Sequence, residues 1–250
     1  MGIDVTVQPI SMDWAGLDGA SLDALADVAN YDRPGVDADR SAARAAIDWD
    51  TRPEIPYDLT EEQIAASVAA VQRLQSGLAE RIGAPVSWAE KVPAPLDFDA
   101  WEEAEGFIGQ LAPDGLDEML GIAAVLSSGV KPESLEQLMN TGSDELTRRV
   151  WDEGSGSFAN ILAISISTLF VPAPLPHPLV GPAHRLASRG GLASELERFA
   201  EAAFGVGLDE LLRDPPFGGG LRDSIISNVE LIAEGLEVAA ARGLPLVVSG

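Results

Sequence analysis

The sequence lacks cysteine altogether and contains little positive charge. None of its 250 residues is a cysteine, 16 are lysine or arginine and 40 are aspartate or glutamate, so the formal net charge is -24. The absence of cysteine excludes disulfides, cysteine-based zinc sites and iron–sulfur clusters. The scarcity of lysine and arginine argues against nucleic acid or an anionic membrane as a partner, because both are bound through clustered positive charge.

The chain also has no long apolar run and no pattern typical of a secretory signal. Its longest apolar stretch, residues 158–171, is interrupted by Ser165, Ser167 and Thr168. A membrane span needs about 20 predominantly apolar residues. Hydrophobic residues nevertheless make up 46% of the chain, enough for a core. We therefore expect a soluble, cytoplasmic protein with a single domain over 1–250, the alternative being a boundary in the proline-rich stretch 85–95.

The negative charge is unevenly distributed. Residues 1–130 contain 24 acidic and 7 basic side chains, whereas residues 131–190 contain 6 and 5. A general adaptation for solubility or high salt would spread acidity over every exposed surface. The nearly neutral block 131–190 is therefore expected to be largely buried, or to face a ligand or partner that disfavours negative charge.

Most of the chain has patterns typical of helices. Residues 60–63 (Thr-Glu-Glu-Gln) form a capping box ahead of apolar residues at helical spacing, and Gly83 supplies a stop. Residues 192–204 are amphipathic, with Glu195 among the polar positions away from the apolar side. The predicted helices cover 22–30, 38–47, 61–82, 97–110, 114–128, 132–140, 144–153, 192–204 and 221–241.

Strand patterns are confined to the two ends of the chain. Ile3, Val5 and Val7 alternate with polar residues, and residues 244–248 form a short apolar run after Gly243. The run 157–171 fits either a helix or a strand, and its length favours a buried helix. Residues 172–182 contain five prolines and are expected to be extended and irregular. The predicted fold class is mainly α: a single helical array with a small β element formed by the N- and C-terminal strands.

The chain carries no recognisable catalytic or metal-binding motif. His177 and His184 are the only histidines, and their spacing of seven on a proline-rich segment matches no ligand motif. Gly190-Gly191, beside Arg189, precedes a helix and could hold an anion at the helix N-terminus, but flexible linkage is the commoner role of such glycines. We predict no metal and no cofactor, and leave open whether the protein is an enzyme, leaning towards a non-catalytic role.

The first functional hypothesis is an acidic binding protein whose partner is a basic protein, in the manner of an immunity or inhibitor protein. It depends on charge complementarity, which favours association with a surface of opposite sign. Acids next to tryptophan make up the candidate partner-binding residues: Asp48, Trp49, Asp50, Trp101, Glu102 and Glu103.

Two alternatives remain. The near-neutral block 131–190 could form the site of an enzyme or of a small-molecule binder. Its candidate ligand-binding residues are His177, His184, Arg185, Arg189 and Trp151. The protein could instead be an assembly subunit that presents the 221–241 helix to copies of itself.

Overall fold

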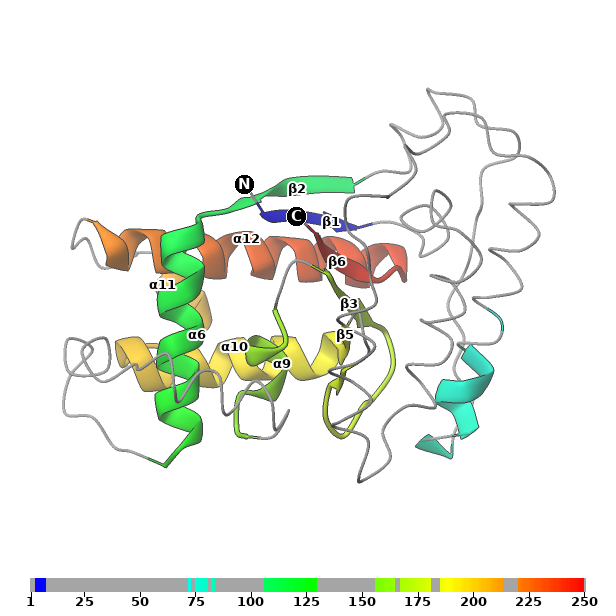
Figure 1. Cartoon of the computed structure of the whole chain (residues 1–250). Coiled ribbons are helices and arrows are strands. Elements are labelled where there is room, and N and C mark those ends of the chain that lie inside the picture. The colour runs from blue at the N-terminus through cyan, green and yellow to red at the C-terminus, as the bar shows by residue number, and fades with distance from the viewer. Residues whose placement is uncertain are drawn as a thin grey trace, which may run out of the picture.

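A six-stranded mixed sheet forms the centre of the protein (Figure 1). The computed structural model describes residues 3–7, 72, 75–80, 82–83, 106–129, 156–164, 167–180, 185–213 and 220–249. In sequence order the strands are β1 (Ile3–Val7), β2 (Gly106–Leu111), β3 (Ser167–Val171), β4 (Leu179–Val180), β5 (Arg185–Ser188) and β6 (Leu246–Ser249). They lie in the order β2-β1-β6-β3-β5-β4. Only β3 and β5 are parallel neighbours; every other neighbouring pair is antiparallel.

The helices of the described residues pack on one another and against this sheet. They are α6 (Pro113–Ser127), α9 (Ala159–Leu162), α10 (Arg189–Phe204), α11 (Leu208–Arg213) and α12 (Leu221–Arg242). Local sequence signals set several of their ends. Pro113 opens α6 at a position where its missing N–H costs nothing. Gly205 and Gly243 end α10 and α12 in the left-handed conformation, which glycine adopts without steric cost.

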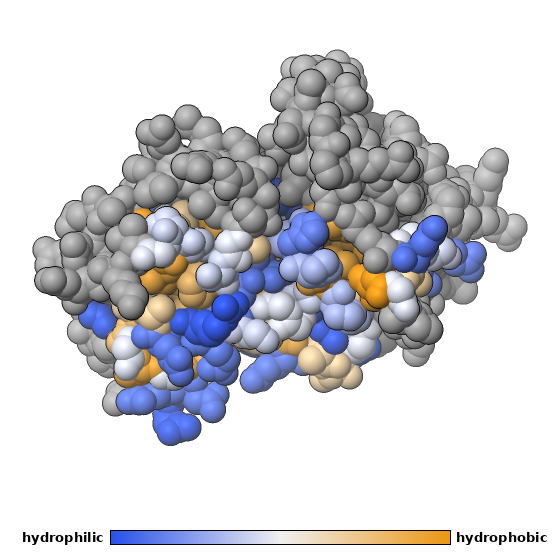
Figure 2. All heavy atoms as spheres, turned by 90° about the horizontal axis from the view of Figure 1, so that it is seen from below, coloured by the Kyte–Doolittle hydropathy of each residue, from blue (hydrophilic) through white to orange (hydrophobic). Residues whose placement is uncertain are grey.

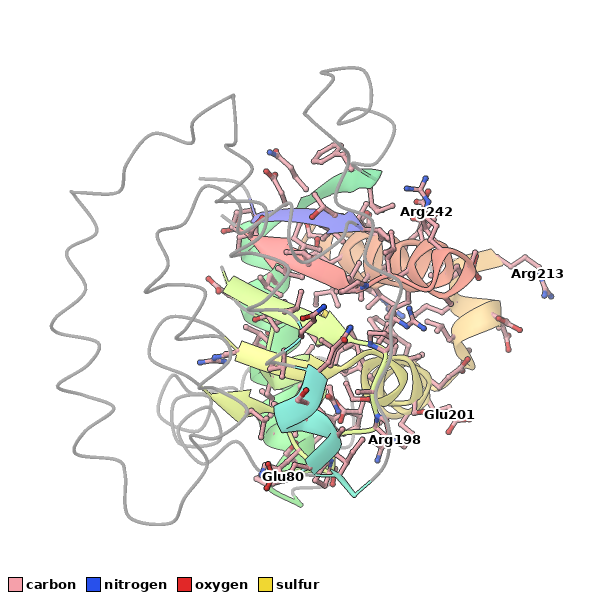
Figure 3. The ribbon with its side chains drawn as sticks, turned by 90° about the vertical axis from the view of Figure 1, so that its right-hand side faces the viewer. Glu80, Arg198, Glu201, Arg213 and Arg242 are labelled. Atoms are coloured by element: carbon pink, nitrogen blue, oxygen red, sulfur yellow. The ribbon has the colours of Figure 1, made fainter. Side chains whose placement is uncertain are left out.

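One face of the sheet packs against α10 and α12, which lie on the same side of the strands in Figure 3. Val5 and Val248 are paired across β1 and β6 and are fully or almost fully buried in the same apolar core. The approach of α12 is close at Gly235, where an added Cβ would lie 2.7 Å from the Leu246 side chain. Burying each such aliphatic side chain stabilises the fold by roughly 1.5–3 kcal/mol relative to exposure.

The opposite face of the sheet is also apolar over its central strands. The strand register aligns one residue from each strand in a continuous row: Phe107, Thr6, Val247, Leu169, Leu186 and Leu179. All are buried except Phe107, which is 56% exposed on the edge strand β2. The Thr6 hydroxyl is buried without a hydrogen-bond partner. Strands buried on both faces lack the alternation that identifies a strand in a sequence.

This sheet corrects the predicted fold class. The N- and C-terminal strands do pair, with Val5 opposite Val248. They are the second and third strands of a six-stranded sheet, however, and not an isolated small β element on a helical array. The prediction of a mainly α protein was wrong because β2, β3, β4 and β5 were not recognised as strands.

Two predicted helices were wrong for this reason. The segment 157–171 is divided between the short α9 and β3, with Ile164 buried between them. The predicted helix 97–110 ends in residues that form β2. Its apolar residues Phe107 and Ile108 lie around a β-bulge, where the register with β1 shifts between Val5 and Thr6.

Several other predictions are confirmed where the structure describes them. Helices α6 and α12 lie within one residue of the predicted 114–128 and 221–241. Helix α10 ends at residue 204 as predicted but begins at Arg189, so Gly190 and Gly191 are helical and do not precede the helix. Residues 75–80 are helical, and Gly83 follows with a φ of 66°. The proline-rich segment after β3 is irregular until the two residues of β4. The predicted helices 22–30, 38–47, 132–140 and 144–153, and the alternative boundary at 85–95, lie outside the described residues.

Candidate functional site

A cleft of about 490 Å³ opens at one edge of the sheet, where the parallel strands β3 and β5 both end. Val171 and Ser188, the last residues of these strands, are register partners. The segment that follows β3 forms one wall, and the first turn of α10, which follows β5, forms the other. The described lining residues are Pro172, Ala173, Pro174, Leu175, Ser188, Arg189, Gly190, Gly191 and Ser194. We call this the α10 cleft.

The wall formed by α10 presents backbone N–H groups. Ser188 caps the helix, and its hydroxyl accepts a hydrogen bond from the Gly191 N–H at 3.1 Å. Arg189 and Gly190 occupy the first two helical positions, whose N–H groups have no acceptor within the helix. Gly190 has open space beside it, with nothing within 4 Å of an added Cβ. A ligand can therefore approach the backbone closely at this position.

Arg189 lines the cleft, and its guanidinium group bonds to the carboxyl end of another helix. Its Nη1 donates to the carbonyl oxygens of Ala239 at 2.7 Å and Leu244 at 2.6 Å, at the carboxyl end of α12. A cation is favourable there because the last carbonyls of a helix carry partial negative charge. Burial lowers the pKa of Arg189, since removing the guanidinium from water disfavours its charged form.

A buried polar network lies beneath the first turn of α10. Glu195 accepts hydrogen bonds from the Asn160 amide nitrogen at 2.7 Å and from the Ile161 N–H at 2.9 Å. The Asn160 amide oxygen accepts from the Ser188 N–H at 3.0 Å. Glu195 and Asn160 are both buried. The network therefore connects α9 to both the cap and the second turn of α10.

The pKa of Glu195 is raised, mainly because burial disfavours the ionised carboxyl group. The hydrogen bonds from Ile161 and Asn160 and the charge of Arg198 act in the opposite direction and only partly offset burial. The carboxyl group has a donor at each oxygen. The two hydrogen bonds favour the ionised carboxylate, because both donate to it. Burial favours the neutral acid and has the larger effect on the pKa.

The described residues that the sequence predicts for a ligand site do not come together in one place. Arg189 lines the α10 cleft. Arg185 is buried, and its Nη1 donates to the carbonyl oxygen of Leu162 at 3.2 Å. His177 is exposed on the segment between β3 and β4 and is not among the lining residues. Most of the cleft lining falls in the neutral block 131–190, but Arg189 is the one described member of the predicted ligand set that lines it. The ligand site inferred from the sequence stays a prediction.

The remaining predicted site residues lie outside the part of the chain that the structure describes. These are Trp151 and His184 from the ligand set, and Asp48, Trp49, Asp50, Trp101, Glu102 and Glu103 from the partner set. Their roles stay predictions.

Sequence reasoning missed the buried members of the site. Glu195 was assigned to the polar side of an amphipathic helix, and in the structure it is 5% exposed. Flexible linkage was given as the commoner role of Gly190-Gly191, and the structure instead places both glycines in the first turn of α10, directly after β5. A serine two residues ahead of Gly190-Gly191, at the start of an amphipathic pattern, was a usable N-cap signal for Ser188. No pattern in the sequence pointed to Asn160.

Within the described residues, no cluster of three or more histidine, aspartate or glutamate side chains is arranged to hold a metal ion. Over the same residues, no helix combines the length and apolar character needed to cross a membrane. The cytoplasmic location inferred from the sequence stays a prediction.

Comparison with known proteins finds no match for this chain among protein-family models, curated proteins or solved structures.

Proposed function

We propose that the protein binds a small molecule in the α10 cleft, through a carboxylate or phosphate group on that molecule. The observation that carries the proposal is the position of the cleft, at the shared carboxyl edge of the parallel strands β3 and β5. In open sheets with parallel strands, ligands bind in the crevice outside the carboxyl ends of the strands. The cleft also falls in the range of roughly 300–1,000 Å³ typical of small-molecule sites.

The two walls of the cleft would contribute differently to binding. The first turn of α10 offers the N–H groups of Arg189 and Gly190 and the positive end of the helix dipole, both of which favour an anion. The wall after β3 offers Pro172, Ala173, Pro174 and Leu175, which suit an apolar portion of a ligand. These groups bind and orient a ligand, so we propose binding and assign no reaction.

The proposal is tested with two glycine positions that both tolerate a side chain. Gly190 lies in the cleft and Gly207 precedes α11, and neither has an atom within 4 Å of an added Cβ or a positive φ. Gly190→Asp places a negative charge against the bound anion, whereas Gly207→Asp makes the same charge change elsewhere. The probes are inorganic phosphate and acetate, followed through the amide signals of Gly190 and Gly191 by NMR.

We expect one of the two anions to shift these amide signals in the unaltered protein. Affinity should fall about tenfold or more in Gly190→Asp, because like charges repel at short range, and should stay unchanged in Gly207→Asp. The proposal is wrong if neither anion shifts the Gly190 and Gly191 signals of the unaltered protein, or if the two variants bind equally well.

A second candidate function is the binding of a basic protein, in the manner of an immunity or inhibitor protein. It is favoured by how the described charges are arranged. Glu230, Glu234 and Glu237 are exposed along one side of α12, while Arg185 and Arg189 donate to backbone carbonyls inside the protein. Figure 2 shows hydrophilic side chains over much of the underside, with smaller apolar areas between them.

Two of the exposed arginines lie near the ends of α11 and α12. Arg213 and Arg242 lie in the last turns of α11 and α12, and Figure 3 shows Arg213 pointing away from the protein. The assembly-subunit alternative gains no support, because the apolar side of α12 is buried in the core of the same chain.

Lysozyme serves as a basic probe for the second candidate. We expect its association with the protein to slow as the salt concentration rises. Replacing Glu230, Glu234 and Glu237 together by glutamine should slow association further. The control replaces Glu197, Glu201 and Asp209 by their amides, an equal charge change on α10 and α11. Equal slowing by the two triple variants would leave only non-specific attraction and would reject α12 as the contact surface.

A further inference from the structure

We propose that Asn160, which does not line the α10 cleft, is the positioning residue that sets the first turn of α10 and so the shape of the cleft. This inference depends on the proposed function for its consequence, because the turn it places is the wall that would hold the ligand. The structural part can be tested without any ligand.

The carboxamide of Asn160 contacts α10 at two points, the cap and the second turn. Its oxygen accepts from the N–H of Ser188, the cap, at 3.0 Å, and its nitrogen donates to Glu195 on the next turn at 2.7 Å. Asn160 is 7% exposed, so water does not readily replace either hydrogen bond. The backbone of Ser188 and the side chain of Glu195 are thereby held by one planar group.

The fit is close enough to restrict the backbone between these two points. An added Cβ on Gly191 would lie 2.5 Å from the Asn160 amide nitrogen, a distance that real Cβ atoms do not adopt. The Gly191 N–H is in turn bonded to the Ser188 hydroxyl. A displaced Asn160 would therefore move Ser188 and Gly191, which both line the cleft.

Within the part of the chain that the structure describes, the charged groups near Asn160 come from α10 and β5. On α10, Glu195 accepts its amide hydrogen bond, and the charge of Arg198 acts on Glu195. On β5, Arg185 donates to the carbonyl of Leu162, two residues after Asn160. Glu195 is the group whose charge would interact directly with a carboxylate placed at position 160.

Asn160→Asp turns this contact into a pair of carboxyl groups without changing the size of the side chain. At low pH the two groups share a proton, and an O–H···O hydrogen bond keeps the contact. As pH rises and the second proton leaves, two negative charges repel each other. We expect the amide signals of Gly190 and Gly191 to match the unaltered protein at low pH and to depart from it at higher pH.

Asn228→Asp is the matched control. Asn228 bonds to the backbone of Ala112 before α6, so its variant should move amide signals at the start of α6 and leave those of Gly190 and Gly191 in place. Asn160→Ser supplies a second measurement at neutral pH if the aspartate variant unfolds there. The Ser188 N–H then loses its acceptor, and its hydrogen exchange should speed up about tenfold or more.

Two results would overturn the inference. One is that Gly190 and Gly191 signals in Asn160→Asp match the unaltered protein over the whole pH range. The other is that the Ser188 exchange rate is unchanged in Asn160→Ser. Neither reading requires a ligand, so failure of phosphate and acetate to bind the unaltered protein would reject the proposed function and leave this inference standing.

Discussion

Two junctions between a strand and a helix are built alike and differ in what they connect. At the β2–α6 junction Asn228 of α12 holds Ala112, and at the β5–α10 junction Asn160 of α9 holds Ser188. Each asparagine is buried and comes from a different helix. At each junction the third helical residue is a glycine pressed against a neighbour: Gly115 in α6 and Gly191 in α10.

The difference lies in how the second half of each amide is used. Asn228 accepts from the Ala112 N–H at 2.8 Å and donates to the Ala112 carbonyl at 2.9 Å, a closed and neutral pair. Asn160 gives its donor to the carboxyl group of Glu195. The β2–α6 junction is thus an anchor alone, whereas the β5–α10 junction joins a titratable group to the wall of a cleft. A buried asparagine holds the start of the helix at both junctions, but at the β5–α10 junction it also contacts a titratable side chain and supports residues that line the cleft.

The largest expected effect compares the two glycines. Gly115→Ala places its Cβ 2.6 Å from the carbonyl carbon of Ser224, so the backbone of α12 must move. We expect a loss of about 3 kcal/mol in the free energy of unfolding, measured by urea denaturation. Gly191→Ala meets the end of the Asn160 side chain, which can rotate away by giving up its hydrogen bonds, and should cost about 2 kcal/mol.

The two variants should also differ in where the damage appears. Gly191→Ala should disturb the amide signals at the start of α10, and Gly115→Ala those of α6 and the first half of α12. A Gly191→Ala variant that is less stable than Gly115→Ala would contradict the idea that side-chain rotation relieves the clash at the β5–α10 junction.

The second effect is on the pH dependence of stability and arises from Glu195. Its pKa is raised in the folded state, so the folded protein holds this proton at pH values where the unfolded chain has released it. The stability contributed by Glu195 is complete below the unfolded value of about 4.5 and is lost as pH rises through the folded value. Stability should therefore fall across this window as pH rises.

Glu195→Gln isolates this contribution from that of Glu118, whose pKa is also raised by burial. The measurement is the difference in the free energy of unfolding between the two proteins at a series of pH values. We expect the unaltered protein to gain stability relative to Glu195→Gln as pH is lowered towards 4.5. A difference that is constant with pH would show that Glu195 titrates alike in the folded and unfolded chains. At the β2–α6 junction Asn228 bonds to the backbone of Ala112 and not to a carboxyl group, so replacing Asn228 tests no comparable titration.

The sequence predicted those elements whose signals are local. Helices α6, α10 and α12 have apolar residues at helical spacing and end near glycine, and β1 alternates in the manner of a strand with one polar face. Strand β3 could not be recognised, because Leu169, Phe170 and Val171 are buried on both faces and form a continuous apolar run. Its identity is decided by pairing with β5 and β6, which are distant in sequence or not obvious as strands.

In the candidate site, too, the residues with a local sequence pattern were predictable and those placed by distant contacts were not. Arg189 and the two glycines after it form a local pattern in the sequence, and they do lie in the cleft. Glu195 fits the polar side of its helix by periodicity and is buried because α9 packs against it with two donors. A contact between residues 35 positions apart leaves no trace in helical periodicity.

The smallest expected effect compares Gly190 with its neighbour Gly191. Gly190 is helical with open space around it, so Gly190→Ala removes conformational freedom from the unfolded chain without a clash. We expect a gain of about 0.5–1 kcal/mol. Gly207→Ala is the control, because Gly207 also has open space but lies at the N-cap of α11, where alanine is disfavoured. If Gly190→Ala destabilised the protein, the space beside Gly190 would be too small for a methyl group. Both glycines would then be required for close packing, and the β5–α10 junction would be packed on all sides, like the β2–α6 junction.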